Sequence, residues 1–581
     1  MDARLIALRT EMQHRNIDVL IVPRGDAYQG EEVPAFEDRL NYISGFTGSA
    51  GTAIISNDQA ALFSDGRYTI QMQAETSDEW SCHTIPDTNM LAWMKDHIPA
   101  GNLGIDPWLL SLSQWRDFNK KLADTAFSLS ILDGNLIDAI WPDRPSPPHQ
   151  PAWDYPLKYS GKTRQDKIAD VAAHLKDISA DQLLITGPDQ LNWLLNIRGH
   201  DITHSPLFLS FALMDIDGTV TIFADADRLK AIDHAGIAVV PPKDMLDHLA
   251  SLRHNKVAID PSSCPYVLAK ILDGNTVEAA SVITSLKAEK NETEVAGFHS
   301  AHQRDAVAMV RFLAWLDAAA ASGVREVEAG EKLLAFRAEV EGFISTSFAT
   351  ICGAGANGAI VHYRAEAGKD SVIKDGSLCL IDSGGQYLDA TTDITRTVAI
   401  GTPSDQMRHD FTHVLKAHIA LDGAIFPPGT NGVQLDALTR APLWAAGMDF
   451  AHGTGHGVGC CLNVHEGPQN ISKRGVLPIK AGMVISNEPG YYIEGQYGIR
   501  IENLLIAVPV EGTSHDGYLR FDHVTLVPMD KRLIDVAYLD DKEIAWVNEY
   551  HAKVQRVIEP MIAQLGDHAV SAWFAEATSA I

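Results

Sequence analysis

The fold of the C-terminal half is decided by the stretch Leu380-Ile-Asp382-Ser-Gly-Gly-Gln-Tyr-Leu-Asp-Ala-Thr-Thr-Asp393-Ile-Thr-Arg-Thr397. Its two apolar runs predict strands, and the glycines between them let the chain reverse. A hairpin centred near residue 387 would place Asp382 and Asp393 side by side. Adjacent carboxylates repel, so this pair needs a cation or a shared proton. Asp389 lies in the expected turn, where we expect it to be solvated.

Three histidines lie in a glycine-rich segment further along, His452-Gly-Thr-Gly-His456-Gly-Val-Gly459 followed by His465-Glu-Gly-Pro468. Two histidines four residues apart on a helix would resemble the zinc-binding pair of zincins. The glycines make a helix implausible here. They favour an irregular loop whose imidazoles point into one cavity that His465 can also reach. An isolated histidine is ordinarily a core or surface residue, but three in one such run favour a functional site.

Two glutamates follow at strand ends. Glu488 closes an apolar strand and precedes Pro489-Gly490. In Gly498-Ile-Arg-Ile-Glu502 the alternation places Arg500 and Glu502 on one strand face, where a surface ion pair is the ordinary interpretation. Four carboxylates around an imidazole are nevertheless too acidic to assemble without divalent cations. Such oxygen-rich ligation suits Mn²⁺, with Co²⁺, Fe²⁺ or Zn²⁺ as alternatives, and can hold two metals.

A proline cluster and a charged segment divide the chain. Six prolines between Pro142 and Pro156 predict a linker. The apolar strands 18–22 and 181–185 are each followed by a Leu-Asn-aromatic segment, so we expect two related α/β domains in tandem. The charged segment from Lys287 opens a long helix, and hairpin-forming strands follow. We therefore expect an α+β chain with domains at 1–157, 158–288 and 289–581. Helical spacing over 542–565 predicts a helix that packs on the third domain or on a partner subunit.

Composition limits the classes of partner and compartment. The chain has 581 residues and a formal charge of −28, which argues against nucleic acid or an anionic membrane surface as its main partner. It has no apolar run long enough for a transmembrane helix and no secretory signal at its N-terminus. Six cysteines without a CxxC pair favour a reducing compartment. We expect a cytoplasmic protein.

Together these motifs resemble the metallopeptidase family with the pita-bread fold, which includes methionine aminopeptidase, prolidase and aminopeptidase P. The segments IDSG…TTDITRT, HGTGHGVG…NVHEGP, SNEPGYY and GIRIEN are most similar to the aminopeptidase P (Xaa-Pro aminopeptidase) branch, in its long three-domain cytosolic form. The resemblance covers the whole chain. It implies two creatinase-type α/β domains, a pita-bread catalytic domain with a C-terminal extension at about 521–581, and a homodimer.

The resemblance also implies a site for two divalent metals, with Mn²⁺ the most expected. One metal would be bound by Asp382, the other by His456 and Glu488, with Asp393 and Glu502 bridging them. Arg500 would orient Asp382, which would help to hold the free α-amine of the substrate.

The implied reaction is hydrolysis of the bond between an N-terminal residue and a following proline. A metal-bridging hydroxide would attack the carbonyl, and Glu488 would relay its proton to the proline nitrogen. His362 and His465 would hydrogen-bond the oxyanion or nearby carbonyls, although the apolar run around His362 by itself favours a core histidine. His452 would line the proline pocket with Tyr491 or Tyr492.

One further motif lies in the first domain. Ser64-Asp-Gly-Arg67-Tyr68 matches a recurrent segment of the family, which implies that Arg67 binds substrate; a turn stabilised by Asp65 is the alternative. Two rival functions stay open. Prolidase shares the five ligands, but its histidine loop usually continues as VHD, where this chain has Val464-His465-Glu466. A non-catalytic binding protein on the same fold is disfavoured by the complete ligand set.

Overall fold

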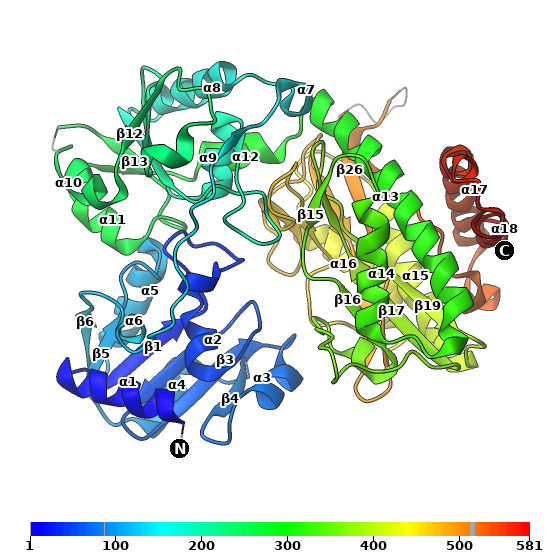
Figure 1. The fold of residues 1–581 in the computed structure, drawn as a ribbon, viewed down its shortest axis with the longest axis horizontal. Coiled ribbons are helices and arrows are strands. Elements are labelled where there is room, and N and C mark those ends of the chain that lie inside the picture. Colours follow the sequence, from blue (N-terminus) through cyan, green and yellow to red (C-terminus); the bar gives the residue numbers. More distant parts are fainter. Residues whose placement is uncertain (1, 86, 253, 512–516) are drawn as a thin grey trace. The chain divides into compact units, whose positions relative to one another are not determined.

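The computed structural model describes residues 2–85, 87–252, 254–511 and 517–581. The chain divides into two compact units, one of residues 1–157 and 162–283 and one of residues 158–161 and 284–581 (Figure 1). Within the described ranges, no helix is long and apolar enough to cross a membrane.

The first unit contains two six-stranded sheets with the same topology. Their strand orders are β4-β3-β2-β1-β5-β6 and β12-β11-β10-β8-β13-β14. In each sheet the earliest strand pairs antiparallel with one neighbour and parallel with the other, and the outermost pair on each side is parallel. This shared order confirms the expected pair of related α/β domains. The strands are β1 (Val19–Pro23), β2 (Thr52–Ser56), β3 (Ala60–Asp65), β4 (Ser81–Ile85), β5 (Gly101–Ile105), β6 (Phe127–Ile131), β8 (Gln182–Ile185), β10 (Phe211–Asp215), β11 (Val220–Phe223), β12 (Ile237–Val240), β13 (Val257–Ile259) and β14 (Thr276–Glu278).

Helices accompany both sheets, and the proline-rich connection between them is irregular. Between α6 and the two-residue strand β7 (Trp153–Asp154), which pairs with β9 (Ile197–Arg198), the chain forms neither helix nor strand, as the prolines predict. The helices are α1 (Ala3–His14), α2 (Arg39–Ser44), α3 (Thr69–Glu75), α4 (Met90–His97), α5 (Leu112–Leu122), α6 (Leu136–Ala139), α7 (Leu157–Ser160), α8 (Arg164–Asp177), α9 (Pro188–Leu195), α10 (Met245–Ala250), α11 (Tyr266–Ile271) and α12 (Val282–Ala288).

The second unit combines long helices with antiparallel sheets, which confirms the α+β class. Its largest sheet has the order β20-β27-β26-β23-β21-β22, and a three-stranded sheet has the order β16-β17-β19. The pairs β15-β18 and β24-β25 complete it. The strands are β15 (Phe343–Thr346), β16 (Ile351–Ala354), β17 (Ser377–Ser383), β18 (Gly385–Tyr387), β19 (Ile394–Ile400), β20 (Ile425–Phe426), β21 (Gly455–Gly457), β22 (Glu466–Ile471), β23 (Val484–Asn487), β24 (Gly490–Ile493), β25 (Tyr497–Arg500), β26 (Asn503–Pro509) and β27 (Leu519–His523).

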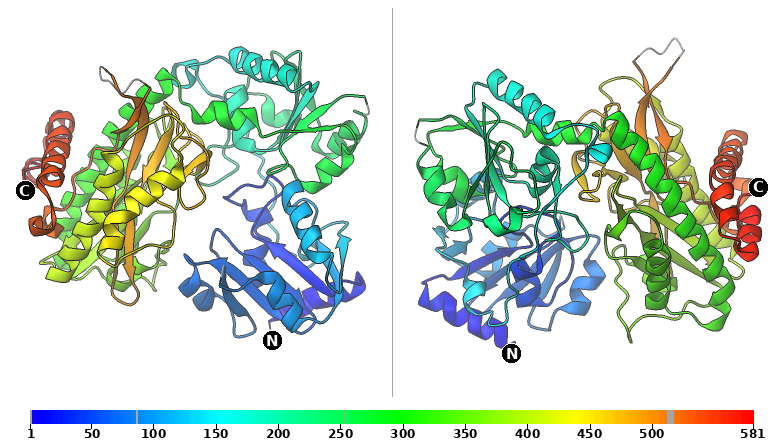
Figure 2. Two further views of the ribbon diagram at one scale, coloured as in Figure 1. Left: turned by 180° about the vertical axis from the view of Figure 1, so that it is seen from behind. Right: turned by 45° about the horizontal axis from the view of Figure 1, so that its top comes forward.

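The helices that pack around these sheets are α13 (Glu292–Ala319), α14 (Glu326–Ala338), α15 (Asp405–Asp422), α16 (Gly432–Ala445), α17 (Asp541–Gln564) and α18 (His568–Ala577). The long helix expected after Lys287 is α13, which begins at a capping box between Asn291 and Glu294. The predicted C-terminal helix is α17. It buries Val547 and Val554 in the core of its own unit and lies with α18 beside α13 (Figure 2).

The hairpin expected around residue 387 is present, with the short strand β18 in its connection. Strands β17 and β19 pair antiparallel, with Asp382 opposite Thr395. The expectation for Asp389 was wrong: it is half-buried and accepts a hydrogen bond from Arg304 Nη2 at 2.5 Å. The connection is not a free tip, because β18 pairs with β15 and the carbonyl of Asp389 lies 2.3 Å from where a Cβ on Gly297 of α13 would stand.

Candidate metal centre

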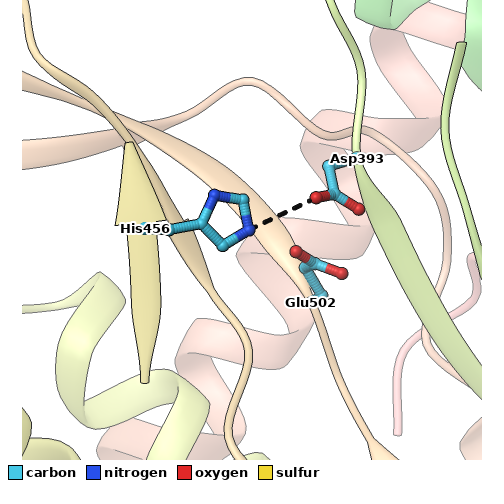
Figure 3. A group of neighbouring side chains, drawn as sticks. All are labelled: Asp393, His456 and Glu502. Atoms are coloured by element: carbon cyan, nitrogen blue, oxygen red, sulfur yellow. Dashed lines mark ion pairs between the residues drawn. The ribbon is translucent and has the colours of Figure 1, made fainter. Parts of the chain in front are cut away.

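Three side chains from distant parts of the second unit converge on one point. Asp393 directly precedes β19, His456 is the middle residue of β21, and Glu502 directly precedes β26. Each offers a ligand atom, and these atoms all lie within 4.8 Å of one another (Figure 3). Glu488, which directly follows β23, approaches the same imidazole nitrogen: His456 Nε2 is 3.5 Å from Glu488 Oε1 and 3.5 Å from Asp393 Oδ2.

The histidine segment is a strand at its centre, not the irregular loop that its glycines suggested. Strand β21 lies between β22 and β23. A Cβ on Gly455 would stand 1.9 Å from Ser486 O, and one on Gly457 would stand 2.4 Å from Glu466 O. Glycine is therefore required on both sides of His456 by close packing of the neighbouring strands, which overrides its low strand propensity.

Hydrogen bonds orient the ligand atoms. His456 Nδ1 lies 2.9 Å from the carbonyl oxygen of Gly457. A carbonyl only accepts, so in the neutral imidazole the proton is on Nδ1 and the lone pair of Nε2 faces the carboxylates. Thr395 Oγ1 donates to Glu502 Oε2 at 2.8 Å. The side chain of Thr395 was not anticipated, although the alternation in Asp393-Ile-Thr395-Arg-Thr397 places it on the same strand face as Asp393.

Arg500 holds Asp382 at the edge of this cluster. Its Nη2 donates to Asp382 Oδ2 at 2.6 Å, and its Nη1 donates to Tyr492 Oη at 2.7 Å. Arg500 is buried, so the sequence pair Arg500–Glu502 is not the surface ion pair that the local pattern favours. The Oδ1 atoms of Asp382 and Asp393 are buried and have no hydrogen-bond partner among the described residues. Buried acceptors of this kind require a partner, and a cation supplies one.

The raised pKa values of the clustered carboxylates also indicate that a cation binds among them. Burial raises the pKa of Asp382 despite the opposing charge of Arg500. Burial also raises the pKa of Glu488, and it raises that of Glu502 well above its usual value, with the Asp393 carboxylate as the next cause. Ionising these groups together is unfavourable unless positive charge lies among them. The donor set of carboxylates and one imidazole therefore fits divalent cations.

Comparison with known proteins decides the family. Models of the "Creatinase/Prolidase N-terminal domain" match residues 4–133 and 143–294, that of "Metallopeptidase family M24" matches residues 296–508, and that of the "C-terminal region of peptidase_M24" matches residues 517–581. A probable Xaa-Pro aminopeptidase P from Laccaria bicolor is 40% identical over 98% of this chain and 92% of its own length. The chain belongs to metallopeptidase family M24.

Two further M24 relatives extend along the whole chain. Aminopeptidase P2 from Arabidopsis thaliana is 38% identical over 94% of this chain and 84% of its own length. The crystal structure of X-prolyl aminopeptidase from Caenorhabditis elegans, described as a cytosolic enzyme with a di-nuclear active site, superposes with a TM-score of 0.95 at 31% identity and covers 100% and 99% of the two chains. The fold is thus two creatinase-type domains followed by an M24 pita-bread domain. A prolidase from Thermococcus sibiricus resembles this fold over 63% of this chain and 98% of its own, at a TM-score of 0.52 and 23% identity.

Two further histidines, His465 and His452, are connected to the metal-ligand cluster. The ring of His465 lies 4.3 Å from that of His456. His452 Nδ1 lies 2.7 Å from the carbonyl oxygen of Gly453, so its Nε2 accepts the hydrogen bond from Tyr492 Oη at 2.8 Å. Burial raises the pKa of Tyr492 to about 12, so its hydroxyl keeps the proton that it donates.

His362 and Tyr491 have less direct connections to the cluster. Arg500 Nη2, which binds Asp382, also donates to the carbonyl of Val361 at 3.4 Å, and this contact brings the segment of His362 to the site. Tyr491 pairs with Ile499 in the β24–β25 ladder and packs against the hydrophobic core of the second unit.

Arg67 lies in the first unit and is engaged by its own turn. Its Nε and Nη2 donate to the two carboxylate oxygens of Asp65 at 2.8 and 2.7 Å. This geometry favours the alternative of a turn stabilised by Asp65.

A buried ion-pair cluster beside His465 was missed. Glu466 is shared by Lys287, at 2.5 Å from its Oε2, and by Lys290, which binds its Oε1. Both lysines belong to the charged segment before α13, and their side chains are 2% and 0% exposed. Nothing in the local sequence of Glu466 marks it as the centre of a buried ion-pair cluster.

Proposed function

We propose that this chain is a dinuclear-metal aminopeptidase that hydrolyses the bond between an N-terminal residue and a following proline in Xaa-Pro peptides. The proposal is carried by one observation: Asp393, His456 and Glu502 converge, with Glu488 beside them, in a chain whose relatives named Xaa-Pro aminopeptidase P are similar along its whole length. Prolidase is the second candidate. It is less favoured because the T. sibiricus prolidase covers only 63% of this chain.

The metal site is proposed as follows. Asp382 would hold one cation, His456 and Glu488 the other, and Asp393 and Glu502 would bridge them. Two divalent cations, with Mn²⁺ the first choice and Co²⁺, Zn²⁺ or Fe²⁺ as alternatives, would lower the pKa of a nucleophilic water and polarise the scissile carbonyl.

The chain's own residues then bind, orient and move protons. Glu488 would take the proton of the attacking water and deliver it to the leaving proline nitrogen. Ser486 Oγ donates to Glu488 Oε1 at 3.1 Å and holds the carboxylate in place. His362 and His465 would donate to the carbonyl oxygen as negative charge develops on it.

The remaining assignments concern substrate binding. Asp382 would hold the free α-amine of the substrate. His452, held by Tyr492, would line the proline pocket, with Tyr491 as the other aromatic candidate. Arg67 would bind substrate only if it exchanges Asp65 for a substrate carboxylate.

We further propose the domain limits 1–157, 158–288 and 289–581, with the C-terminal extension at about 521–581, and a cytoplasmic homodimer. The C. elegans relative is described as cytosolic, which supports the compartment. Helix α16 exposes three large apolar side chains, Val433, Leu438 and Trp444, the last 49% exposed, which supports a protein interface. Light scattering coupled to gel filtration tests the dimer: a mass of about 63 kDa, that of one chain, would refute it.

The decisive experiment is hydrolysis by metal-reconstituted protein. We expect cleavage of an Xaa-Pro-Xaa tripeptide with Mn²⁺, and no cleavage of a Met-Ala control. Cleavage of an Xaa-Pro dipeptide alone would assign prolidase, and no cleavage with Mn²⁺, Co²⁺ or Zn²⁺ would support a binding protein. Glu488→Ala should abolish turnover, whereas Glu494→Ala, an exposed glutamate between β24 and β25, should not.

A further inference from the structure

The segment that carries His362 has almost no regular structure of its own. Between β16 and Ser371 the described chain contains one short 3₁₀ helix, Gly355–Ala359, and neither α-helix nor strand. Its backbone and side-chain polar groups therefore need partners outside the segment. The position of His362 depends on what those partners are.

One buried carboxylate supplies many of them. Glu326, the first residue of α14, is 0% exposed. Its Oε1 accepts from Ala354 N at 2.7 Å, and its Oε2 accepts from Ser371 N at 2.7 Å and from Tyr363 Oη at 2.8 Å. Asn357 Nδ2 donates to both oxygens at 3.0 Å. One side chain thus binds the beginning, middle and end of the segment.

These four partners are neutral donors, so Glu326 acts as an anionic acceptor and not as half of a salt bridge with them. Hydrogen bonds to an ionised carboxylate are stronger than those between neutral groups. The position at the N-terminus of α14 adds the favourable field of the helix dipole. Both effects compensate for burying the charge, and both are lost if the carboxylate becomes an amide.

A second anchor acts on the other side of His362. Arg500 donates to the carbonyl of Val361 while it holds Asp382, and Glu326 accepts from the hydroxyl of Tyr363. The residues directly before and after His362 are therefore fixed by two different charged groups. The arginine connects the segment to the metal centre, and the glutamate connects it to α14.

We propose that Glu326 is a positioning residue that holds His362 at the reaction centre. This role rests on the proposed function, in which His362 contacts the substrate carbonyl. It makes Glu326 an indirect determinant of transition-state binding that makes no contact with substrate. Misplacement of a reacting or stabilising group by about 1 Å can cost about 100-fold in rate.

The kinetic test is a double-mutant cycle. Glu326→Gln should lower kcat by about 100-fold with little change in KM. Tyr363→Phe, which removes a single donor, should lower it less. In a His362→Ala background, Glu326→Gln should have little further effect, because the residue that it positions is gone. If Glu326→Gln lowers kcat by the same factor in the His362→Ala background as in wild type, Glu326 has a role in folding alone and the proposal is overturned. Glu331→Gln, at an exposed position of the same helix, is the matched control.

A readout independent of activity uses trypsin. Arg364 and Lys369 are exposed tryptic sites within the segment. Mass spectrometry measures the initial rate of cleavage after these two residues. We expect this rate to be higher in Glu326→Gln and Tyr363→Phe than in wild type and Glu331→Gln. Unchanged cleavage would overturn the proposal. If wild type cleaves no Xaa-Pro peptide, the proposed function fails, while the trypsin result still decides whether Glu326 orders the segment.

Discussion

Replacing Glu466 by glutamine should strongly destabilise the second unit, because it removes the charge at the centre of a buried ion-pair cluster. Glu466 and its two lysine partners are buried, and Lys290 Nζ also donates to the carbonyl of Lys287 at 2.9 Å. The amide keeps the size of the side chain but removes the negative charge that both ammonium groups share. The change therefore isolates the electrostatic contribution.

The size of the destabilisation follows from the burial of Glu466 and its two lysine partners. Removing one partner of a buried pair costs about 3–5 kcal/mol, because the other charge stays buried without compensation. A matched control lies in the same segment: Glu289 binds Lys480 at 2.6 Å, but their side chains are 41% and 56% exposed. Breaking an exposed pair costs about 0–1 kcal/mol. Glu466→Gln and Glu289→Gln should thus differ by about 3 kcal/mol in the free energy of unfolding.

Urea unfolding of Glu466→Gln, Glu289→Gln and wild type, followed by circular dichroism, measures this difference. Lys290→Met should lie between the two glutamine variants, because Glu466 keeps its bond to Lys287. Equal midpoints for Glu466→Gln and Glu289→Gln would refute the reasoning. Because His465 directly precedes Glu466, we also expect kcat to fall in Glu466→Gln and to stay unchanged in Glu289→Gln.

Three further predictions concern the metal centre. Arg500→Met should weaken Mn²⁺ binding by about 10–100-fold in calorimetry, because Asp382 loses its 2.6 Å donor; unchanged affinity would contradict that role. Burial raises the pKa values of Asp382, Glu488 and Glu502 above those of the unfolded chain. The metal-free folded state therefore binds more protons than the unfolded state, and it loses stability as the pH rises from the unfolded toward the folded pKa values. Chelation should therefore lower the melting temperature more at pH 8 than at pH 5, and the reverse order would show that these groups are not raised. Gly455→Ala should prevent metal binding, because its Cβ would stand 1.9 Å from Ser486 O, whereas Gly453→Ala meets nothing closer than 3.4 Å and should bind metal normally.

Local chemistry in the sequence determined much of the fold. The apolar runs on either side of the glycine turn predict the β17–β19 hairpin, although the expected alignment of Asp382 with Asp393 is displaced, because Asp382 lies opposite Thr395. The proline cluster predicts the irregular connection after α6, and the charged segment from Lys287 predicts the long helix, which begins a few residues later with Asn291 as its N-cap. Each of these features depends on neighbours within one turn, strand or helix end, where residue type and spacing are sufficient.

Tertiary structure alone decided the features whose partners are distant in the chain. Glu466 is paired across 176 and 179 residues with two buried lysines. Glu326 draws its donors from residues up to 45 positions away, and nothing in its own helix marks it as buried. His456 lies in a strand despite its glycines, because the carbonyls of Ser486 and Glu466 leave no room for side chains beside it. Sequence specifies which groups can bind or repel, but burial, which sets the strength of those interactions, exists only once the strands and helices have packed.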